Sequence, residues 1–207
     1  MKSYSTYLFD FDGTLVDSHD SLVKVFEDSY AVVGVKVPEG YCLRLMRIPL
    51  FQGYAELHAP EDEISKKRFG DMINESLDAP EVLKLTKTYE DALPNLYRLK
   101  DRGAKLGIVT SNNVNHVKDV LHFLNIPEGL FAVIIGNKET KKHKPNPDPL
   151  YKALELLNIT KDDVCYVGDA LQDKETAINA GMDAVLLDRH HEYDNESGIV
   201  IHSLSEL

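Results

Sequence analysis

Four short polar segments hold the side chains that could carry out chemistry. In chain order they are Asp10-Phe11-Asp12-Gly13-Thr14, Thr110-Ser111-Asn112, Lys144-Pro145 and Gly168-Asp169, the last with Asp173 one helical turn further on. Clustered carboxylates repel one another and attract a hard divalent cation with oxygen ligands, typically Mg²⁺. Such a cation, a lysine ammonium and a hydroxyl group together suit a phosphoryl group. Two aspartates separated by one residue can divide the work, because one carboxylate can attack while the other transfers protons.

Short apolar runs precede these segments, at residues 7–9, 106–109, 131–135 and 164–167, and a further run lies at 184–187. The runs are continuous rather than alternating, which is typical of parallel strands buried on both faces. Helical periodicity fills the intervals after residue 88, so the pattern predicts a doubly wound α/β domain with a parallel sheet. Because ligands bind beyond the carboxyl ends of such strands, we expect the polar segments to converge on one edge.

Residues 17–85 interrupt the alternation of strands and helices. This stretch has helical patterning at both ends and prolines between them, and it contains no run that reads as a buried parallel strand. The sequence therefore predicts a core domain made of residues 1–16 and 86–207, with a helical insertion at 17–85.

The polar segments resemble the motifs of a known family. Residues 10–18 resemble the first motif of the haloacid dehalogenase (HAD) superfamily phosphatases, residues 106–110 the second, Lys144-Pro145-Asn146-Pro147 the third and residues 167–173 the fourth. The motifs follow the family's order and span residues 7–173. The resemblance, which is to the phosphoglycolate phosphatase and β-phosphoglucomutase branch, implies a Rossmann-like core with a helical cap inserted after the first motif.

The resemblance also implies roles for the acids. Asp10 is implied as the nucleophile that forms an aspartyl-phosphate, and Asp12 as the acid that protonates the leaving oxygen and then activates water. Mg²⁺ is implied as the cofactor, held by Asp10, the backbone carbonyl of Asp12 and Asp169, with support from Asp173. An alternative for Asp173 is an ordinary acid in the first turn of a helix, where the helix dipole favours it.

Thr110 and Lys144 are implied to bind the oxygens of the transferring phosphoryl group. Ser111 becomes the phosphate-binding hydroxyl instead if the preceding strand ends one residue later than expected. In the helical insertion, Arg44 and Arg47 could clamp an anionic leaving group, or could be surface arginines of a helix.

These residues bear differently on other functions. A calcium loop starting at Asp10 would need Glu at its twelfth position, which is Ser21. Dehalogenases and phosphonoacetaldehyde hydrolases of the superfamily lack an acid at the position of Asp12, which disfavours cleavage of carbon–halogen and phosphonate bonds. A phosphosugar mutase of the β-phosphoglucomutase type, a pyrophosphatase and a nucleotidase stay open. A non-catalytic protein that binds a phosphometabolite would be expected to have a degraded motif.

Composition limits the partners. The 207 residues carry 23 Lys and Arg against 34 Asp and Glu, a net charge of −11, which disfavours nucleic acids and anionic membranes. The expected partner is a small phosphorylated metabolite, and the oligomeric state, monomer or dimer, stays open. The sequence contains no visible targeting or membrane-spanning segment. Its two cysteines, Cys42 and Cys165, do not have the spacing of a disulfide framework, so a cytoplasmic protein is expected.

Overall fold

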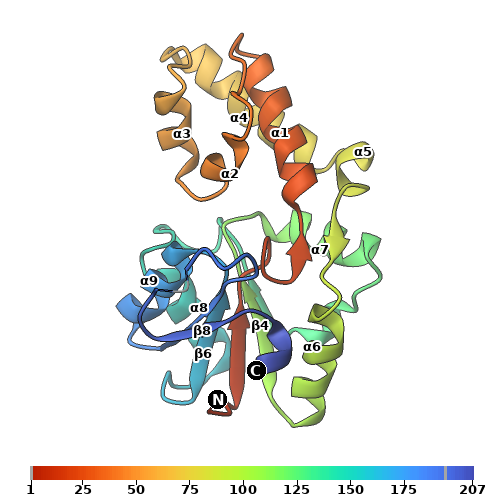
Figure 1. Cartoon of the computed structure of the whole chain (residues 1–207), viewed down its shortest axis with the longest axis vertical. Coiled ribbons are helices and arrows are strands. Elements are labelled where there is room, and N and C mark those ends of the chain that lie inside the picture. Colours follow the sequence, from red (N-terminus) through yellow and green to blue (C-terminus); the bar gives the residue numbers. More distant parts are fainter. Residues whose placement is uncertain (1, 194) are drawn as a thin grey trace. The chain divides into compact units, whose positions relative to one another are not determined.

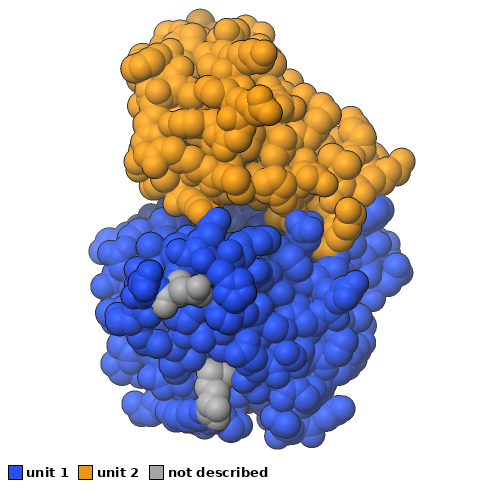
Figure 2. All heavy atoms as spheres, viewed as in Figure 1, with its two compact units in different colours: residues 1–17, 88–207 blue, residues 18–87 orange. Residues whose placement is uncertain are grey.

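The computed structural model describes residues 2–193 and 195–207. The chain divides into two compact units, which Figure 2 shows in different colours. The sheet unit consists of Met1–Asp17 and Thr88–Leu207, and the helical unit consists of Ser18–Lys87. None of the helices within the described residues is long and apolar enough to span a membrane.

The sheet unit is built on a six-stranded sheet, seen nearly edge-on in Figure 1. Its strands are β1 (Thr6–Phe9), β4 (Lys105–Val109), β5 (Val133–Ile135), β6 (Val164–Gly168), β7 (Asp183–Leu187) and β8 (Ile199–Ile201). They lie in the order β5-β4-β1-β6-β7-β8 and every pair is parallel. The chain therefore builds outward from β1 in one direction and then in the other. This is the strand order of a doubly wound Rossmann-like domain, which confirms the predicted fold class.

The helices of this unit are α6 (Ala92–Asp101), α7 (Val114–Phe123), α8 (Asp148–Leu157) and α9 (Leu171–Ala180), with short 3₁₀ turns at Glu128–Leu130 and Leu204–Glu206. One core joins the faces of α8 and α9 to the side chains of the central strands, among them Leu8 and Tyr166. The continuous apolar strands of the sequence are thus buried as expected for a covered parallel sheet. The short strand β8 was not predicted, because its three apolar residues are too few to form a recognisable run.

The helical unit contains α1 (His19–Ala31), α2 (Cys42–Leu45), α3 (Leu50–Glu56), α4 (Glu63–Leu77) and α5 (Pro80–Leu83). Its core centres on three aromatic rings, those of Tyr30, Tyr54 and Phe69, with centroids 4.8 to 6.3 Å apart. Two short strands, β2 (Val16–Asp17) and β3 (Lys87–Thr88), pair in a separate sheet where the chain passes from one unit to the other. The sequence placed the insertion at 17–85, and the compact unit spans 18–87.

Candidate active site

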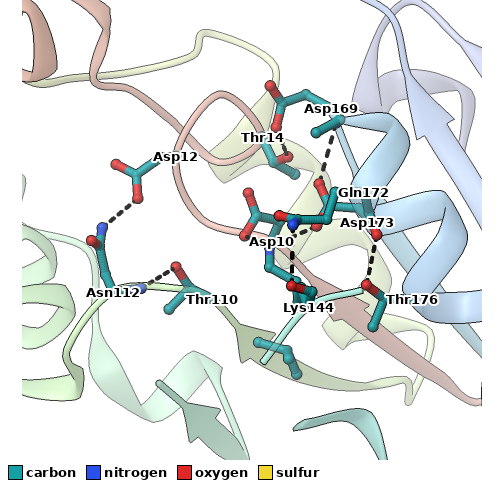
Figure 3. A network of polar contacts seen from close by, with 12 residues as sticks. Asp10, Asp12, Thr14, Thr110, Asn112, Lys144, Asp169, Gln172, Asp173 and Thr176 are labelled. Atoms are coloured by element: carbon teal, nitrogen blue, oxygen red, sulfur yellow. Dashed lines mark hydrogen bonds and ion pairs between the residues drawn. The ribbon is translucent and has the colours of Figure 1, made fainter. Parts of the chain in front are cut away.

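The polar segments gather at the carboxyl ends of the central strands. β1 has β4 on one side and β6 on the other, and Phe9 at its end pairs in register with Ile108 and Val167. Asp10 therefore leaves the sheet between the ends of both neighbours, and its backbone N–H donates to the carbonyl of Val167 at 2.8 Å. Thr110 follows β4 and Asp169 follows β6, so all three segments meet at one edge (Figure 3). The order of strands in a parallel sheet is what brings these distant residues together.

Lys144 lies within a cluster of acids at this edge. Its Nζ is 2.8 Å from Oδ1 of Asp10 and 2.6 Å from Oδ1 of Asp173. The three side chains are at most 10% exposed, so these ion pairs are largely removed from solvent. Asp169 is nearby, and one carboxylate oxygen from each of Asp10, Asp169 and Asp173 lies within 4.8 Å of the others. The cluster thus holds three carboxylates against one ammonium.

Electrostatics of the cluster favour an additional cation. Burial raises the pKa of Asp10 well above its usual value, and the neighbouring acids raise it further against the opposing effect of Lys144. Burial, followed by the charge of Asp173, raises the pKa of Asp169 to about 7. Burial acts to lower the pKa of Lys144, but Asp10 and Asp173 hold it well above its usual value, so this side chain stays charged. Three oxygen-donating acids with excess negative charge fit a hard divalent cation such as Mg²⁺.

A glycine turn lets the first segment approach the fourth. Gly13 has a φ of +75°, and a Cβ atom built on it would lie 2.9 Å or less from the carboxylate atoms of Asp169. Only glycine adopts this conformation without strain and leaves that space open. The next residue, Thr14, donates its hydroxyl to Oδ1 of Asp169 at 3.1 Å. Gly13 and Thr14 of the first motif therefore hold the loop after β1 against the carboxylate of Asp169.

Asp12 lies on the same loop but is directed elsewhere. Its Oδ2 accepts a hydrogen bond of 2.5 Å from the Nδ2 of Asn112, and Figure 3 shows this pair apart from the lysine and its acids. The carboxylate of Asp12 is not part of the acid cluster found among the described residues. This placement is compatible with a role for its backbone carbonyl, rather than its side chain, at a metal.

The two candidate hydroxyls differ in environment. Thr110 is 5% exposed, and its Oγ1 accepts a hydrogen bond of 3.1 Å from the backbone N–H of Asn112. Ser111 is exposed. The buried position of Thr110 at the strand end favours it over Ser111 as the phosphate-binding hydroxyl.

Tyr166 is a member of this network that the sequence analysis did not include. Its hydroxyl donates to the backbone carbonyl of Val109 at 2.7 Å and lies 3.1 Å from Oδ1 of Asp173 and 3.3 Å from Nζ of Lys144. Burial, and then the charge of Asp173, raises the pKa of this hydroxyl, which keeps it protonated. The one feature of the sequence that could have indicated Tyr166 is its polar hydroxyl within an otherwise apolar strand.

A second contact that the sequence did not predict holds the loop of the first motif through the backbone of Thr14. Arg189 donates to the carbonyl of Thr14 at 3.0 Å and to both carboxylate oxygens of Asp91 at 3.0 Å each. Asp91 also accepts hydrogen bonds from Ser203 and from the backbone of Leu204, both at 2.8 Å. The loop that carries Asp10 and Asp12 is thereby tied to the C-terminal segment, and nothing in the local sequence pattern indicated this.

The two candidate arginines belong to the helical unit. Arg44 forms a bidentate pair with Glu56, with both nitrogen–oxygen distances 2.7 Å, and Tyr41 donates to the same carboxylate at 2.7 Å. An anion that bound Arg44 would have to compete with this carboxylate. Arg47 is exposed. A clamp by either arginine stays a prediction.

Comparisons with known proteins place the chain among related hydrolases. The family model of haloacid dehalogenase-like hydrolases matches residues 7–187. A protein of Caldanaerobacter subterraneus subsp. tengcongensis, named provisionally as the pyrophosphatase PpaX, is 33% identical over 181 residues, covering 86% of this chain and 79% of the relative. A phosphoglycolate phosphatase of Psychrobacter arcticus is 28% identical over 200 residues, covering 91% of this chain and 85% of the relative.

Solved structures show the same fold. A protein from Bacteroides fragilis, described provisionally as a haloacid dehalogenase-like hydrolase, superimposes with a TM-score of 0.88 at 26% identity and covers 99% of both chains. The chain is thus a Rossmann-like α/β hydrolase with an acidic site at the strand ends. It belongs to the haloacid dehalogenase-like hydrolase family. The predicted family and the predicted class, a phosphatase-type hydrolase, are both confirmed.

Proposed function

We propose that this protein is a Mg²⁺-dependent phosphatase that hydrolyses a small phosphorylated metabolite through an aspartyl-phosphate on Asp10. The observation that carries the proposal is the buried contact of Asp10 with Lys144, at 2.8 Å, beside Asp169 and Asp173. A nucleophilic carboxylate and a fixed cationic side chain for phosphoryl oxygens are the parts that such a reaction needs. The names of the relatives, a phosphoglycolate phosphatase and a pyrophosphatase, support the same class of substrate.

The metal would be held by the carboxylates of Asp10 and Asp169 and by the backbone carbonyl of Asp12. Asp173 supports the site from behind through its contact with Lys144. When bound there, Mg²⁺ supplies positive charge that offsets the repulsion between the acids and the phosphoryl group. The ammonium of Lys144 and the hydroxyl of Thr110 bind phosphoryl oxygens and orient the phosphorus toward Asp10.

The proposed reaction has two steps. In the first, a carboxylate oxygen of Asp10 attacks phosphorus, and the bond from phosphorus to the leaving oxygen breaks as that oxygen takes a proton from Asp12. In the second, the carboxylate of Asp12 takes a proton from water as the water oxygen attacks phosphorus, and the bond between phosphorus and the oxygen of Asp10 breaks to release inorganic phosphate. Asp10 returns to a carboxylate and Asp12 to an acid, so both are ready for another cycle.

We propose that the helical unit acts as the cap that selects the substrate. The printed names of the relatives make phosphoglycolate and pyrophosphate the first compounds to test, followed by sugar phosphates and nucleotides. If Arg47 clamps the far end of an anionic substrate, Arg47→Ala should raise KM for the best compound. An unchanged KM would remove Arg47 from the binding site.

The proposal is tested by hydrolysis of 4-nitrophenyl phosphate. We expect phosphate release that needs Mg²⁺ and that falls by at least about a thousandfold in Asp10→Asn, because the amide is not a nucleophile. Full activity of this variant, or of the wild-type protein in EDTA, would contradict the mechanism. Rearrangement of a sugar phosphate without release of inorganic phosphate would indicate a mutase instead.

A further inference from the structure

A hydrogen bond joins Asn112 to Asp12, two residues that lie far apart in the sequence. The Nδ2 of Asn112 donates to Oδ2 of Asp12 at 2.5 Å, although the two residues are 100 positions apart in the sequence. Asp12 lies in the loop after β1 and Asn112 in the turn after β4, and both belong to the sheet unit. Figure 3 shows the amide and the carboxylate directed toward each other.

The backbone of Asn112 is held from two sides, which fixes the point from which its side chain extends. Its N–H donates to Oγ1 of Thr110 at 3.1 Å, and its carbonyl accepts from the N–H of Asn137 at 2.9 Å. Gly136 permits this approach, because a Cβ atom there would come within 2.9 Å of the backbone nitrogen of Val114. The amide is therefore presented to Asp12 by a turn anchored to the ends of β4 and β5.

We infer that Asn112 is a positioning residue that holds Asp12 in the orientation needed to protonate the leaving oxygen. This inference rests on the proposed function, in which Asp12 is the acid. Proton transfer requires the acid to lie within hydrogen-bond reach of the leaving oxygen. The reaction slows when the side chain of the acid samples rotamers that point elsewhere. The Asn112 hydrogen bond restricts those rotamers.

The chemical step also gains from this contact. As the bond between phosphorus and the leaving oxygen breaks, its electron pair goes to that oxygen, which takes the proton of Asp12. Asp12 is left as a carboxylate, and Oδ2 of this carboxylate accepts the N–H of Asn112. A hydrogen bond to a charged acceptor is stronger than one to a neutral acceptor, so it favours the state in which the proton has been given up.

The test uses a series of aryl phosphates from 2,4-dinitrophenyl to phenyl phosphate, with kcat/KM as the readout. Dinitrophenolate departs without protonation, whereas phenolate depends on it. We expect Asn112→Leu to keep activity within about twofold on the dinitrophenyl compound and to lose about tenfold or more on the phenyl compound. A loss of equal size on both substrates would overturn the inference, since a general structural defect or a lost substrate contact does not depend on the leaving group.

Two further variants separate this inference from the proposed function. Asp12→Asn should itself show the leaving-group-dependent loss, and the double variant Asp12→Asn, Asn112→Leu should be no slower than Asp12→Asn alone. If Asp12→Asn shows no such loss, Asp12 is not the acid and the proposed function fails together with the inference. If Asp12→Asn shows it and Asn112→Leu does not, only the role of Asn112 is overturned.

Matched controls address folding. Asn112→Asp keeps the size and backbone contacts of the residue but replaces the donor by a carboxylate, so we expect a selective loss at least as large as in Asn112→Leu. The neighbouring Asn113 caps α7 by accepting from the N–H of Asn115 at 2.9 Å. Asn113→Ala should reduce stability without any leaving-group dependence. A selective loss in Asn113→Ala equal to that in Asn112→Leu would contradict the assignment.

Discussion

Asp169 should make the metal-free protein less stable as the pH rises. Burial and the charge of Asp173 raise its pKa from 3.8 to about 7. A carboxyl group whose pKa is raised by folding binds more protons in the folded state than in the unfolded state between those two values. Its contribution to stability is therefore fully present below about pH 4 and is lost as the pH rises through about 7.

The size of this effect follows from the shift. Each pH unit between the two pKa values corresponds to about 1.4 kcal/mol, which gives an upper bound of about 4 kcal/mol. Asp169 is partly exposed, so solvent screening reduces the effect, and we expect about 2 kcal/mol. Hydrogen bonds lower the pKa values of Asp91 and Asp188 despite burial, so their contributions change below about pH 4. Asp10, whose pKa is raised like that of Asp169, adds to the loss of stability within this window.

The assay is urea unfolding in EDTA at about pH 5 and about pH 8. We expect the free energy of unfolding of the wild-type protein to fall by at least about 2 kcal/mol between these values, and that of Asp169→Asn to fall by about 2 kcal/mol less, because the raised pKa of Asp10 contributes to the fall in both proteins. The amide of this variant can still accept the hydrogen bond from Thr14. Mg²⁺ at the higher pH should restore the stability of the wild-type protein but not raise that of Asp169→Asn to the same degree.

Asp183→Asn is the matched control, because Asp183 pairs with Lys2 at the surface, at 3.2 Å. It should show the same fall as the wild-type protein. The reasoning is refuted if Asp169→Asn shows the full fall, or if the metal-free wild-type protein is equally stable at both pH values.

Further variants test the packing and the network. The hydroxyl of Tyr30 is buried without a hydrogen-bond partner among the described residues, so Tyr30→Phe should leave the free energy of unfolding unchanged or raise it by up to about 1 kcal/mol. Tyr54→Phe should lower it by about 1 kcal/mol, because that hydroxyl donates to a backbone carbonyl at 2.7 Å; equal effects of these two variants would contradict the interpretation. Tyr166→Phe should lower kcat/KM about tenfold and cost about 1 to 3 kcal/mol in urea unfolding, since a buried carbonyl loses its donor; wild-type values for both would refute this. Thr110→Ala should lower kcat/KM about a hundredfold and Ser111→Ala by less than about threefold, and the reverse order would make Ser111 the phosphate-binding hydroxyl.

The fold was predictable because its signals are local. The apolar run at β6 has no alternation, and it is followed at once by Gly168 and Asp169. Such a run predicts a buried parallel strand, and the strand order then places its end beside that of β1. Asp10 and Asp169 were recognisable for the same reason, since each directly follows a strand, and Asp173 lies in the first turn of the helix that comes next.

The parts of the site that were not predicted from the sequence depend on contacts between distant segments. The hydroxyl of Tyr166 reaches from β6 past β1 to the carbonyl of Val109 on β4, and no spacing in the sequence encodes that distance. The pair of Asp12 and Asn112 likewise depends on the direction of two turns. These contacts are set by the three-dimensional fold, whereas the polar residues at the strand ends can be recognised from the sequence.

The central claim is that Asp10 is phosphorylated during turnover. The most direct measurement uses Asp12→Asn with 2,4-dinitrophenyl phosphate and Mg²⁺, since this leaving group departs without an acid while the second step still lacks its base. Acid quenching followed by intact-mass and peptide mass spectrometry should show one added phosphoryl group on the peptide that contains Asp10. The control Asp10→Asn, Asp12→Asn should show none. A phosphoryl group on another residue, or a burst of dinitrophenolate with no phosphorylated protein, would contradict the account.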